Sequence, residues 1–462
     1  MIVKDKIYID LDTEYVDPGM FPLLTYENPD YFQKMNMGLS VHGVSKEVKT
    51  WVLNNRELQI PRGEALKIKP YFGNLWKPEF DHPDHPVKLQ YINDDFELDQ
   101  HQVGAVAAMQ QYRQGIIHAV TSAGKSLMIL KGIVESGQRG LIVVHRKVLM
   151  QQFLEDIDKY IRDEKGNKIT PGIVGGGKSS IGDITIAIDK SLSKNLPAYQ
   201  GAFGVVVLDE CHLAPAKTIF DLINNINSKK RFGFSGTLKR KDGKQFLMFA
   251  TFGSIIHTIE KEVLLEAGRV VPVYPKILES ETRFDWDQVV TALTEQEHSN
   301  PTVKARQLQE EVIANDPERQ RLIVDHVKRL YDVGGKTLVM SRYVEPCYSL
   351  QKQLLERFNI ESGVITGKNA KEAVASYQDM KHGDSKVIFA TIGCVSTGVS
   401  ISDLWDGVLI SPIHTNELLL HQIRGRLMRT APGKNHGTLW FIHDPYIFKD
   451  WKLKNFLRIM KN

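Results

Sequence analysis

The segment Ala119–Ser126 (AVTSAGKS) constrains the fold of this chain more than any other feature of the sequence. Its spacing is that of a phosphate-binding loop, with Ala119 where a first glycine is usual. Such a loop joins a buried strand to a helix, and the apolar runs Gly115–Ala119 and Leu127–Leu130 supply both. Backbone N–H groups at the start of that helix cradle phosphate oxygens. The segment therefore predicts an α/β domain that binds a nucleotide.

Each residue of the loop has an expected role. Ser122, Ala123 and Gly124 offer backbone N–H groups to the phosphates, and Lys125 neutralises the β- and γ-phosphates. The Ser126 hydroxyl is expected to be a ligand of Mg²⁺. ATP and Mg²⁺ are the predicted cofactors. The alternative, a Gly-Lys-Ser turn that arises by chance, is disfavoured by the strand–loop–helix context.

A second apolar run, Val205–Leu208, ends in the acids Asp209 and Glu210. The carboxyl ends of parallel strands form the binding crevice of such sheets, and unpaired charge is costly there, so packing alone does not explain two acids. We expect Asp209 to hold Mg²⁺, directly or through water, and Glu210 to orient and deprotonate the attacking water. His212 is predicted to couple this strand to Ser235–Thr237 rather than to bind a metal.

The arginines near the carboxyl end form the third part of the predicted site. Gln422, Arg426 and Arg429 are spaced by four and three residues, which places them on one helical face. Arg426 or Arg429 is expected to act as an arginine finger, and a basic surface helix is the alternative. Gln422 is grouped with the nucleotide-binding residues. Gln102 is expected to read adenine through its amide, with a helix-surface glutamine as the alternative.

Short β-branched runs alternate with helical stretches in two successive series. The first series includes Gly140–Val144, Ile184–Ile188, Val205–Leu208 and Arg231–Phe234, and the second includes Thr337–Met340, Val387–Ala390, Gly407–Ile410 and Thr438–Ile442. Near-continuous apolar strands of this length indicate parallel sheets that are covered on both faces. The prolines of Val270–Pro275 suit a connection between the two series. Two doubly wound α/β domains are therefore predicted.

Residues 1–88 contain no nucleotide motif and end in the linker-like stretch Lys77–Pro86. Ile7–Ile9 and Ala65–Lys69 have the alternation of strands, and they predict a small α+β accessory domain. The aromatic cluster Tyr71–Trp76 either forms the core of that domain or stacks on exposed bases of a nucleic acid.

Composition places the chain among soluble globular proteins, with 42% hydrophobic and 25% charged residues. The three cysteines have no paired spacing, and no signal or membrane segment is visible, so a reducing cytoplasm is expected. The net charge is only +4, but residues 413–462 contain nine Lys/Arg against three acids. Binding to nucleic acid would therefore depend on local basic patches.

Six stretches occur in one fixed order, and over roughly residues 94–445 they resemble the motif series of the superfamily 2 helicases. They are Thr121–Ser126, Asp209–His212, Ser235–Thr237, Leu338–Arg342, Thr391–Ser400 and Gln422–Arg429. Asp209–Ala214, Ser235–Lys244 and Ser396–Ser400 look most like the phage UvsW-type branch-migration helicases. If the chain is phage-encoded, as this resemblance implies, the expected cytoplasm is that of the host. The resemblance implies an accessory domain (residues 1–88), a RecA-like domain with the ATP site (89–272) and a RecA-like domain with the arginine fingers (273–462).

The resemblance also implies ATP-driven remodelling of branched DNA: Holliday-junction branch migration, fork regression and D-loop unwinding, in recombination, repair or replication. The nucleic-acid contacts that it implies are Arg146, Gln152, Gly176, Lys178, Ser341, Arg342, Thr391, Ser396 and Thr397. Amides, hydroxyls and basic side chains of this kind bind phosphate without reading sequence. Two departures from the family pattern affect these roles: Val144–Arg146 replaces the common Pro-Thr, and Ser400 stands where many members carry Asp.

The expected partner is branched, forked or single-stranded DNA, bound by a monomer, with recombination proteins as further candidate partners and no membrane association. Two alternatives remain open. One is an ATP-dependent RNA helicase, since recognition of the RNA 2′-hydroxyl is not legible in the sequence. The other is an ATP-gated translocase on double-stranded DNA that does not unwind, including the motor part of a restriction complex.

Overall fold

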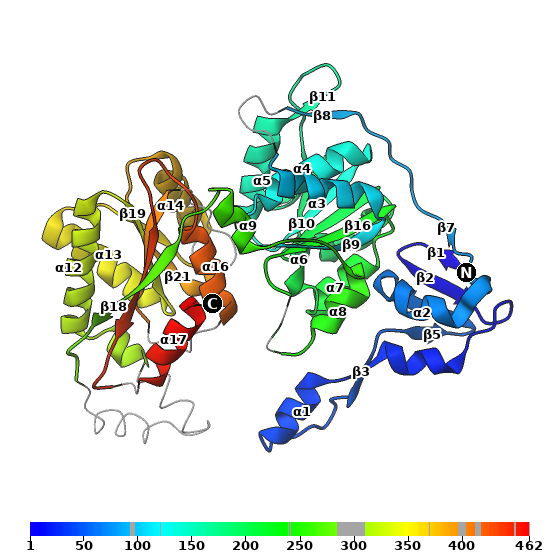
Figure 1. The fold of residues 1–462 in the computed structure, drawn as a ribbon, viewed down its shortest axis with the longest axis horizontal. Helices are drawn as coiled ribbons and strands as arrows, with labels where there is room; N and C mark the ends of the chain where they lie inside the picture. The colour runs from blue at the N-terminus through cyan, green and yellow to red at the C-terminus, as the bar shows by residue number, and fades with distance from the viewer. Residues whose placement is uncertain are drawn as a thin grey trace. The chain divides into compact units, whose positions relative to one another are not determined.

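The computed structural model of the chain (Figure 1) describes all residues except 93–97, 121, 239, 241, 284–309, 369, 396–402, 412–416, 448–449 and 462. The chain divides into two compact units, Met1–Glu260 and Lys261–Asn462. This division lies before the boundary predicted at residue 272. The first unit includes both the predicted accessory domain and the first α/β series. The proposed three-domain boundaries stay a prediction.

An eight-stranded sheet forms the centre of the first unit. Its strands, in order across the sheet, are β13 (Lys178–Ser179), β12 (Gly172–Gly175), β14 (Ile184–Ile188), β10 (Gly140–Val144), β15 (Val205–Asp209), β16 (Lys230–Ser235), β9 (Gln114–Ala119) and β17 (Ile255–Ile259). β13 runs antiparallel to β12, and the other neighbouring pairs are parallel. The helices are α3 (Gln100–Gln111), α4 (Lys125–Ser136), α5 (Lys147–Tyr160), α6 (Asp189–Lys194), α7 (Lys217–Asn224) and α8 (Gln245–Phe252).

Burial explains why the central strands could be predicted. Every residue of β10, β14 and β15 is buried, which requires the unbroken apolar runs seen in the sequence. The predicted bounds 140–144 and 184–188 agree with β10 and β14.

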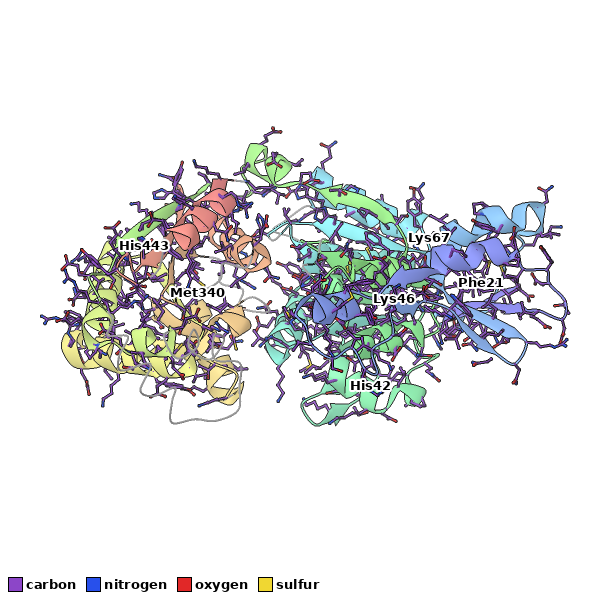
Figure 2. All side chains as sticks on the ribbon, turned by 90° about the horizontal axis from the view of Figure 1, so that it is seen from below. Phe21, His42, Lys46, Lys67, Met340 and His443 are labelled. Atoms are coloured by element: carbon purple, nitrogen blue, oxygen red, sulfur yellow. The ribbon has the colours of Figure 1, made fainter. Side chains whose placement is uncertain are left out.

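The second unit contains a six-stranded sheet whose neighbouring strands are all parallel. Their order is β18 (Val273–Glu279), β23 (Gly437–His443), β22 (Leu404–Leu409), β19 (Lys336–Ser341), β21 (Val387–Thr391) and β20 (Gly363–Ile365). The helices are α9 (Lys261–Glu266), α12 (Pro317–Val333), α13 (Val344–Phe358), α14 (Ala370–His382), α15 (Ile392–Val395), α16 (Glu417–Leu427) and α17 (Trp451–Lys461). Figure 2 labels Met340 of β19 and His443, the last residue of β23. The two parallel α/β sheets confirm the predicted RecA-like fold class.

Residues 1–88 build a sheet of their own with a separate apolar core. The strand order is β5 (Val52–Asn54), β6 (Glu57–Pro61), β2 (Lys6–Asp10), β1 (Ile2–Val3) and β7 (Glu79–Phe80). A second pair, β3 (Thr25–Glu27) and β4 (Glu47–Lys49), brackets helix α1 (Pro29–Asn36). Just beyond this region, β8 (Leu89–Tyr91) and β11 (Ile161–Asp163) form a separate antiparallel pair. The predicted α+β character is thus observed.

One predicted strand of this region is wrong. Ala65–Lys69 lies in helix α2 (Ala65–Phe72), not in a strand. The alternation of Leu66 and Ile68 suggested a strand, but Leu66 is 65% exposed, while Ile68 and Phe72 are buried together. Four residues apart, these two share one face of a helix. Phe72 belongs to the core of this region, so it is not a platform for base stacking.

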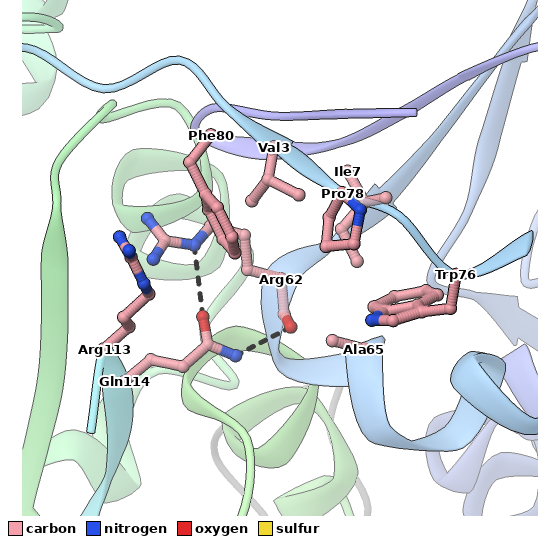
Figure 3. Close-up of a pocket in the computed structure, with 9 residues that line it drawn as sticks. All are labelled: Val3, Ile7, Arg62, Ala65, Trp76, Pro78, Phe80, Arg113 and Gln114. Carbon is pink, nitrogen blue, oxygen red and sulfur yellow. Dashed lines mark hydrogen bonds between the residues drawn. The ribbon is translucent and has the colours of Figure 1, made fainter. Parts of the chain in front are cut away.

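The N-terminal region packs tightly on the amino-terminal edge of the first α/β sheet. A Cβ at Gly63 would lie 2.1 Å from the Phe249 carbonyl oxygen, so only glycine allows this close approach to α8. Arg62 is 2% exposed, and its Nε donates to Gln114 Oε1 over 3.1 Å, while Gln114 Nε2 donates back to the Arg62 carbonyl over 2.7 Å. Figure 3 shows this reciprocal pair beside a cavity of about 170 Å³. The region is therefore an integral part of the first unit.

Candidate active site

The phosphate-binding loop has the strand–loop–helix geometry that the sequence predicts. β9 ends at Ala119 and α4 begins at Lys125, with Gly124 as the residue that precedes the helix. Gly124 has a φ of 78°, and a Cβ there would lie 2.3 Å from the Gln102 amide nitrogen. Ser122 also has a positive φ, 77°. Such conformations are costly outside glycine and gather at functional sites, which supports a built phosphate cradle.

Gln102 holds this loop in place. Its side chain is 3% exposed, its Nε2 donates to the Ala123 carbonyl over 3.0 Å, and its Oε1 accepts from the Asp99 N–H over 3.1 Å. The alternative of a helix-surface glutamine is therefore wrong. The predicted contact with adenine stays a prediction.

Lys125 and the acidic pair meet at the carboxyl end of the sheet. Asp209 is the last residue of β15 and is 7% exposed, and Glu210 follows it with a φ of 56°. Lys125 Nζ lies 3.0 Å from Glu210 Oε1. The left-handed conformation of Glu210 is uncommon for a residue with a Cβ, and it accompanies the approach of the carboxylate to Lys125.

The close approach of Lys125 to the two carboxylates determines the protonation states of Lys125, Asp209 and Glu210. Burial raises the pKa of Asp209, and the neighbouring Glu210 charge raises it further. Burial also acts to raise the pKa of Glu210, but the charges of Lys125 and His212 outweigh it and hold that pKa well below its ordinary value. Burial acts to lower the pKa of Lys125, and the two carboxylates reverse this and raise it. Lys125 and Glu210 are therefore a charged pair at neutral pH.

His212 links this pair to the next motif, as predicted. Its Nδ1 lies 3.1 Å from Glu210 Oε2 and 3.0 Å from Ser235 Oγ. Ser235 Oγ accepts from the Thr237 N–H over 3.1 Å and lies 2.7 Å from the Thr237 carbonyl oxygen. The prediction that His212 is a polar coupler is confirmed. A change at Glu210 can thus reach the loop that follows β16.

The predicted arginines lie at the end of α16 in the second unit. Gln422 and Arg426 belong to this helix and are each 8% exposed, which excludes a plain basic surface helix. The helix ends at Leu427, so Arg429 does not share its face: Arg429 lies beyond the end and forms a β-bridge with Val270. The prediction of one face for all three residues is wrong because the helical repeat stops before Arg429.

Lys434 stabilises this helix end, a role that sequence reasoning missed. Its Nζ donates to the carbonyls of Leu404, Leu427 and Arg429 over 2.7, 2.6 and 2.6 Å. Burial lowers the pKa of Lys434 to about 8, with Arg429 adding to the effect. A lysine shortly after a helix C-terminus is a known means of satisfying the last carbonyls, and that was the available signal.

The predicted nucleic-acid contacts divide into accessible and enclosed residues. Arg146 immediately precedes α5, Gln152 lies within it, and Gly176 and Lys178 are exposed in the hairpin between β12 and β13. Gly176 and Gly177 have φ values of 61° and 85°, as a two-residue hairpin turn requires. The triglycine is thus a defined turn.

In the second unit, Arg342 has a 44% exposed side chain and lies 2.6 Å from Glu310. Ser341 is fully buried with its hydroxyl 3.3 Å from that of Ser411, and Thr391 is 8% exposed with its hydroxyl on Cys394. These two hydroxyls face inward, so their expected contact with phosphate is not supported. Ser396 and Thr397 lie outside the described residues, as do Thr121 and Ser400.

Two RecA-like sheets, the first with a phosphate loop and an acidic pair, define the class of P-loop nucleoside triphosphatases with tandem RecA-like domains. Comparison with known proteins narrows this class. The family model "Type III restriction enzyme, res subunit" matches residues 95–240, and "Helicase conserved C-terminal domain" matches residues 320–431. The chain belongs to superfamily 2 of the helicases, a class of nucleic-acid-dependent ATPases.

Individual relatives are distant. "Probable helicase D10" of Escherichia phage T5 is 24% identical over 69% of this chain and 65% of that protein. "ATP-dependent DNA helicase uvsW" of Enterobacteria phage T4 is 26% identical over 80% of this chain and 73% of that protein. A solved HsdR-subunit fragment of a Vibrio vulnificus YJ016 type I restriction enzyme shares the fold, with a TM-score of 0.52 and 16% identity over 77% of this chain and 65% of that one.

Within the described part of the chain, no cluster of three or more His, Cys, Asp or Glu residues could hold a metal ion. No helix in that part is long and apolar enough to cross a membrane.

Replacing Lys434 by Met should destabilise the second unit and slow ATP turnover. Three carbonyls would lose a charged donor, at a cost of about 3 kcal/mol, and the segment with Arg426 and Arg429 would loosen. Urea unfolding and phosphate release measure the two effects. Lys454→Met, an exposed lysine of α17, is the matched control. Equal stability and turnover in the two variants would contradict the assigned role.

Proposed function

We propose that this protein is an ATP-dependent DNA helicase or translocase that remodels branched DNA, by Holliday-junction branch migration, fork regression or D-loop unwinding. The observation that carries the ATPase part is the Lys125–Glu210 pair, 3.0 Å apart, at the loop that joins β9 to α4. The DNA part rests on the motif series and on the similarity to the T4 relative, which is named a DNA helicase.

The residues present fit ATP and Mg²⁺. A Cβ at Gly124 would collide with Gln102, which holds the loop, so this position needs glycine, and the start of α4 offers backbone donors to phosphates. Lys125 would hold the phosphates, while Ser126 and Asp209 are oxygen ligands of the kind that Mg²⁺ prefers. When bound, Mg²⁺ neutralises charge that develops on the phosphates.

We infer that Glu210 becomes an effective base only when ATP is present. Lys125 would exchange Glu210 for the phosphates, which removes the strongest influence that lowers the Glu210 pKa. Glu210, still 3.1 Å from His212, would then accept a proton from the attacking water. His212 would pass the change to Ser235 and the loop after β16. This sequence of contacts ties hydrolysis to the presence of nucleotide.

The test of the whole function compares a synthetic four-way junction with a linear duplex and with single-stranded RNA. We expect ATP hydrolysis stimulated by DNA, and strand exchange on the junction that requires ATP. Stimulation by single-stranded RNA alone would favour an RNA helicase. Stimulation by DNA without strand separation would favour a translocase, as in the motor part of a restriction complex.

Glu210→Gln should keep ATP binding and lower turnover by roughly 10²- to 10⁴-fold, because it removes the base and preserves size. Lys125→Ala should weaken binding and turnover together. Phosphate release and the affinity for a fluorescent ATP analogue measure the two quantities. Glu135→Gln, in an exposed position of α4, is the control. Near wild-type turnover in Glu210→Gln would show that another group is the base.

Arg426→Ala and Arg429→Ala should each leave ATP affinity close to wild type and reduce turnover, by on the order of 10³-fold for the residue that acts as the finger. The reason is that an arginine finger stabilises charge that develops only in the transition state. Arg458→Ala, an exposed arginine of α17, is the matched control. If neither variant changes turnover, the second unit supplies no arginine finger.

A further inference from the structure

An arm formed by residues 28–46 projects from the N-terminal region. It consists of α1 and the loop that returns to β4, and Figure 1 shows α1 standing apart from the eight-stranded sheet of its unit. No residue of α1 is buried. A helix without a buried face gains little stability from packing, so α1 must be stabilised by its base or by a partner.

The far part of the arm exposes large apolar side chains. Met35, Met37 and Leu39 are 49%, 62% and 56% exposed. Single exposed apolar residues are common, but three within five positions form a patch that suits an interaction. Methionine and leucine are among the side chains that proteins insert as wedges between base pairs.

The base of the arm is held firmly. Tyr26 of β3 stacks on Phe246 of α8, with ring centroids 4.2 Å apart and an interplanar angle of 14°. The Tyr26 hydroxyl donates to Glu64 over 2.8 Å. Asp30, in the first turn of α1, pairs with Lys244 over 2.6 Å. The exposed patch therefore stands on a fixed support.

The same support leads to the active site through consecutive contacts. The carbonyl of His212, the neighbour of Glu210, accepts from Arg240. Arg240 binds Asp242 through two hydrogen bonds of 2.8 and 2.5 Å, and Asp242 accepts from the Lys244 N–H over 3.2 Å. Lys244 then pairs with Asp30 of the arm. This path runs from the general base to the arm within one unit.

Charge identifies the kind of partner. Asp30 is the only acid in residues 28–46, and Lys244 neutralises it. Lys34 and Lys46 are exposed, and neither forms an ion pair within the part of the chain that the structure describes. Lys46 is labelled in Figure 2. Lys34 stands directly before the apolar patch, whereas Lys46 lies at the base of the arm, where its carbonyl accepts from the Asn28 N–H over 2.9 Å. An apolar patch on an arm with two exposed cations suits the end of a duplex, where bases are exposed beside the phosphate backbones.

We propose that Met35, Met37 and Leu39 pack against the terminal base pair at a DNA branch point, with Lys34 on an adjacent phosphate and Lys46 on the DNA backbone nearer the base of the arm. In this proposal the three apolar residues act as a wedge, and the Asp30–Lys244 pair connects the wedge to the active site. The inference rests on the proposed function, because it assigns the strand-separating element of the same DNA motor.

The first experiment removes the apolar patch. The variant Met35→Ser/Met37→Ser/Leu39→Ser should resolve four-way junctions about tenfold more slowly, while ATP hydrolysis stimulated by a plain single strand stays within about twofold of wild type. The control is Val52→Ser/Leu53→Ser/Leu66→Ser, which alters residues of the same region that are 53%, 48% and 65% exposed. Thermal unfolding confirms that both variants are folded.

The second experiment tests the support. Asp30→Asn should raise the ATP consumed per junction resolved by about threefold, and the charge swap Asp30→Lys/Lys244→Asp should restore it. Asp84→Asn is the control, since Asp84 pairs with Lys229 over the same 2.6 Å elsewhere in the unit. Rescue by the swap is a result that loss of fold would not produce.

If the patch variant resolved junctions at the wild-type rate, the proposed wedge role would be wrong. The patch would then be expected to bind a protein partner instead of DNA. An equal slowing in the control variant would overturn the wedge role too. A wild-type protein whose ATP hydrolysis DNA does not stimulate would overturn the proposed function itself. The single-strand ATPase measurement separates these two failures.

Discussion

The charged pair between Lys125 and Glu210 is the interaction on which the active site depends. It brings the start of α4 and the end of β15 together across the carboxyl edge of one sheet, with 3.0 Å between the two charges. Both flanking backbones are unusual, since Gly124 and Glu210 have positive φ values. A folded structure tolerates such conformations when its surroundings stabilise them, here the parallel sheet and Gln102. The packing of the protein itself therefore holds the loop before α4 and the acidic pair close together.

This arrangement has a consequence for control of hydrolysis. While Glu210 is paired with Lys125, its carboxylate is a poor proton acceptor. Lys125 in turn can bind phosphate only if it leaves Glu210. In the proposed mechanism the same residues would keep the site inactive and recognise the nucleotide. Because Glu210 also contacts His212, the proposed exchange would alter the contacts of the loop that carries Arg240 and Lys244. The N-terminal region packs on this unit through buried groups such as Arg62, so it can respond as part of the same body.

The buried packing of Arg62 and Gly63 also determines how the N-terminal region can be studied. Removing residues 1–88 would uncover the Phe249 carbonyl and deprive Arg231, which is fully buried, of the Asp5 carbonyl to which it donates. A buried polar group without its partner is costly, so a truncated chain would lose stability as well as any DNA contact. Exposed residues of the arm are therefore better probes than deletions.

The parts of the structure that the sequence predicted well share one physical property. β10 and β14 are buried along their whole length, so their apolar runs have one interpretation. The nucleotide motif is similarly constrained, because its glycine and lysine must stand at a fixed spacing in the chain for both to reach a phosphate. The prediction of a strand at Ala65–Lys69 was wrong because a short alternation of apolar and charged residues fits both a short strand and two turns of helix. The strand that ends at Ser341 was predicted, but the direction of the Ser341 hydroxyl was not, because it depends on Ser411, which is distant in sequence. Lys434 was missed for the same reason, since its carbonyl partners come from separate elements.

The most direct test of this account is a crystal structure of the wild-type protein with Mg²⁺ and a non-hydrolysable ATP analogue. The account predicts that Lys125 leaves Glu210 and binds the β- and γ-phosphates, while Glu210 keeps its contact with His212 and faces a water molecule. A bound analogue with Lys125 still paired to Glu210 would contradict it.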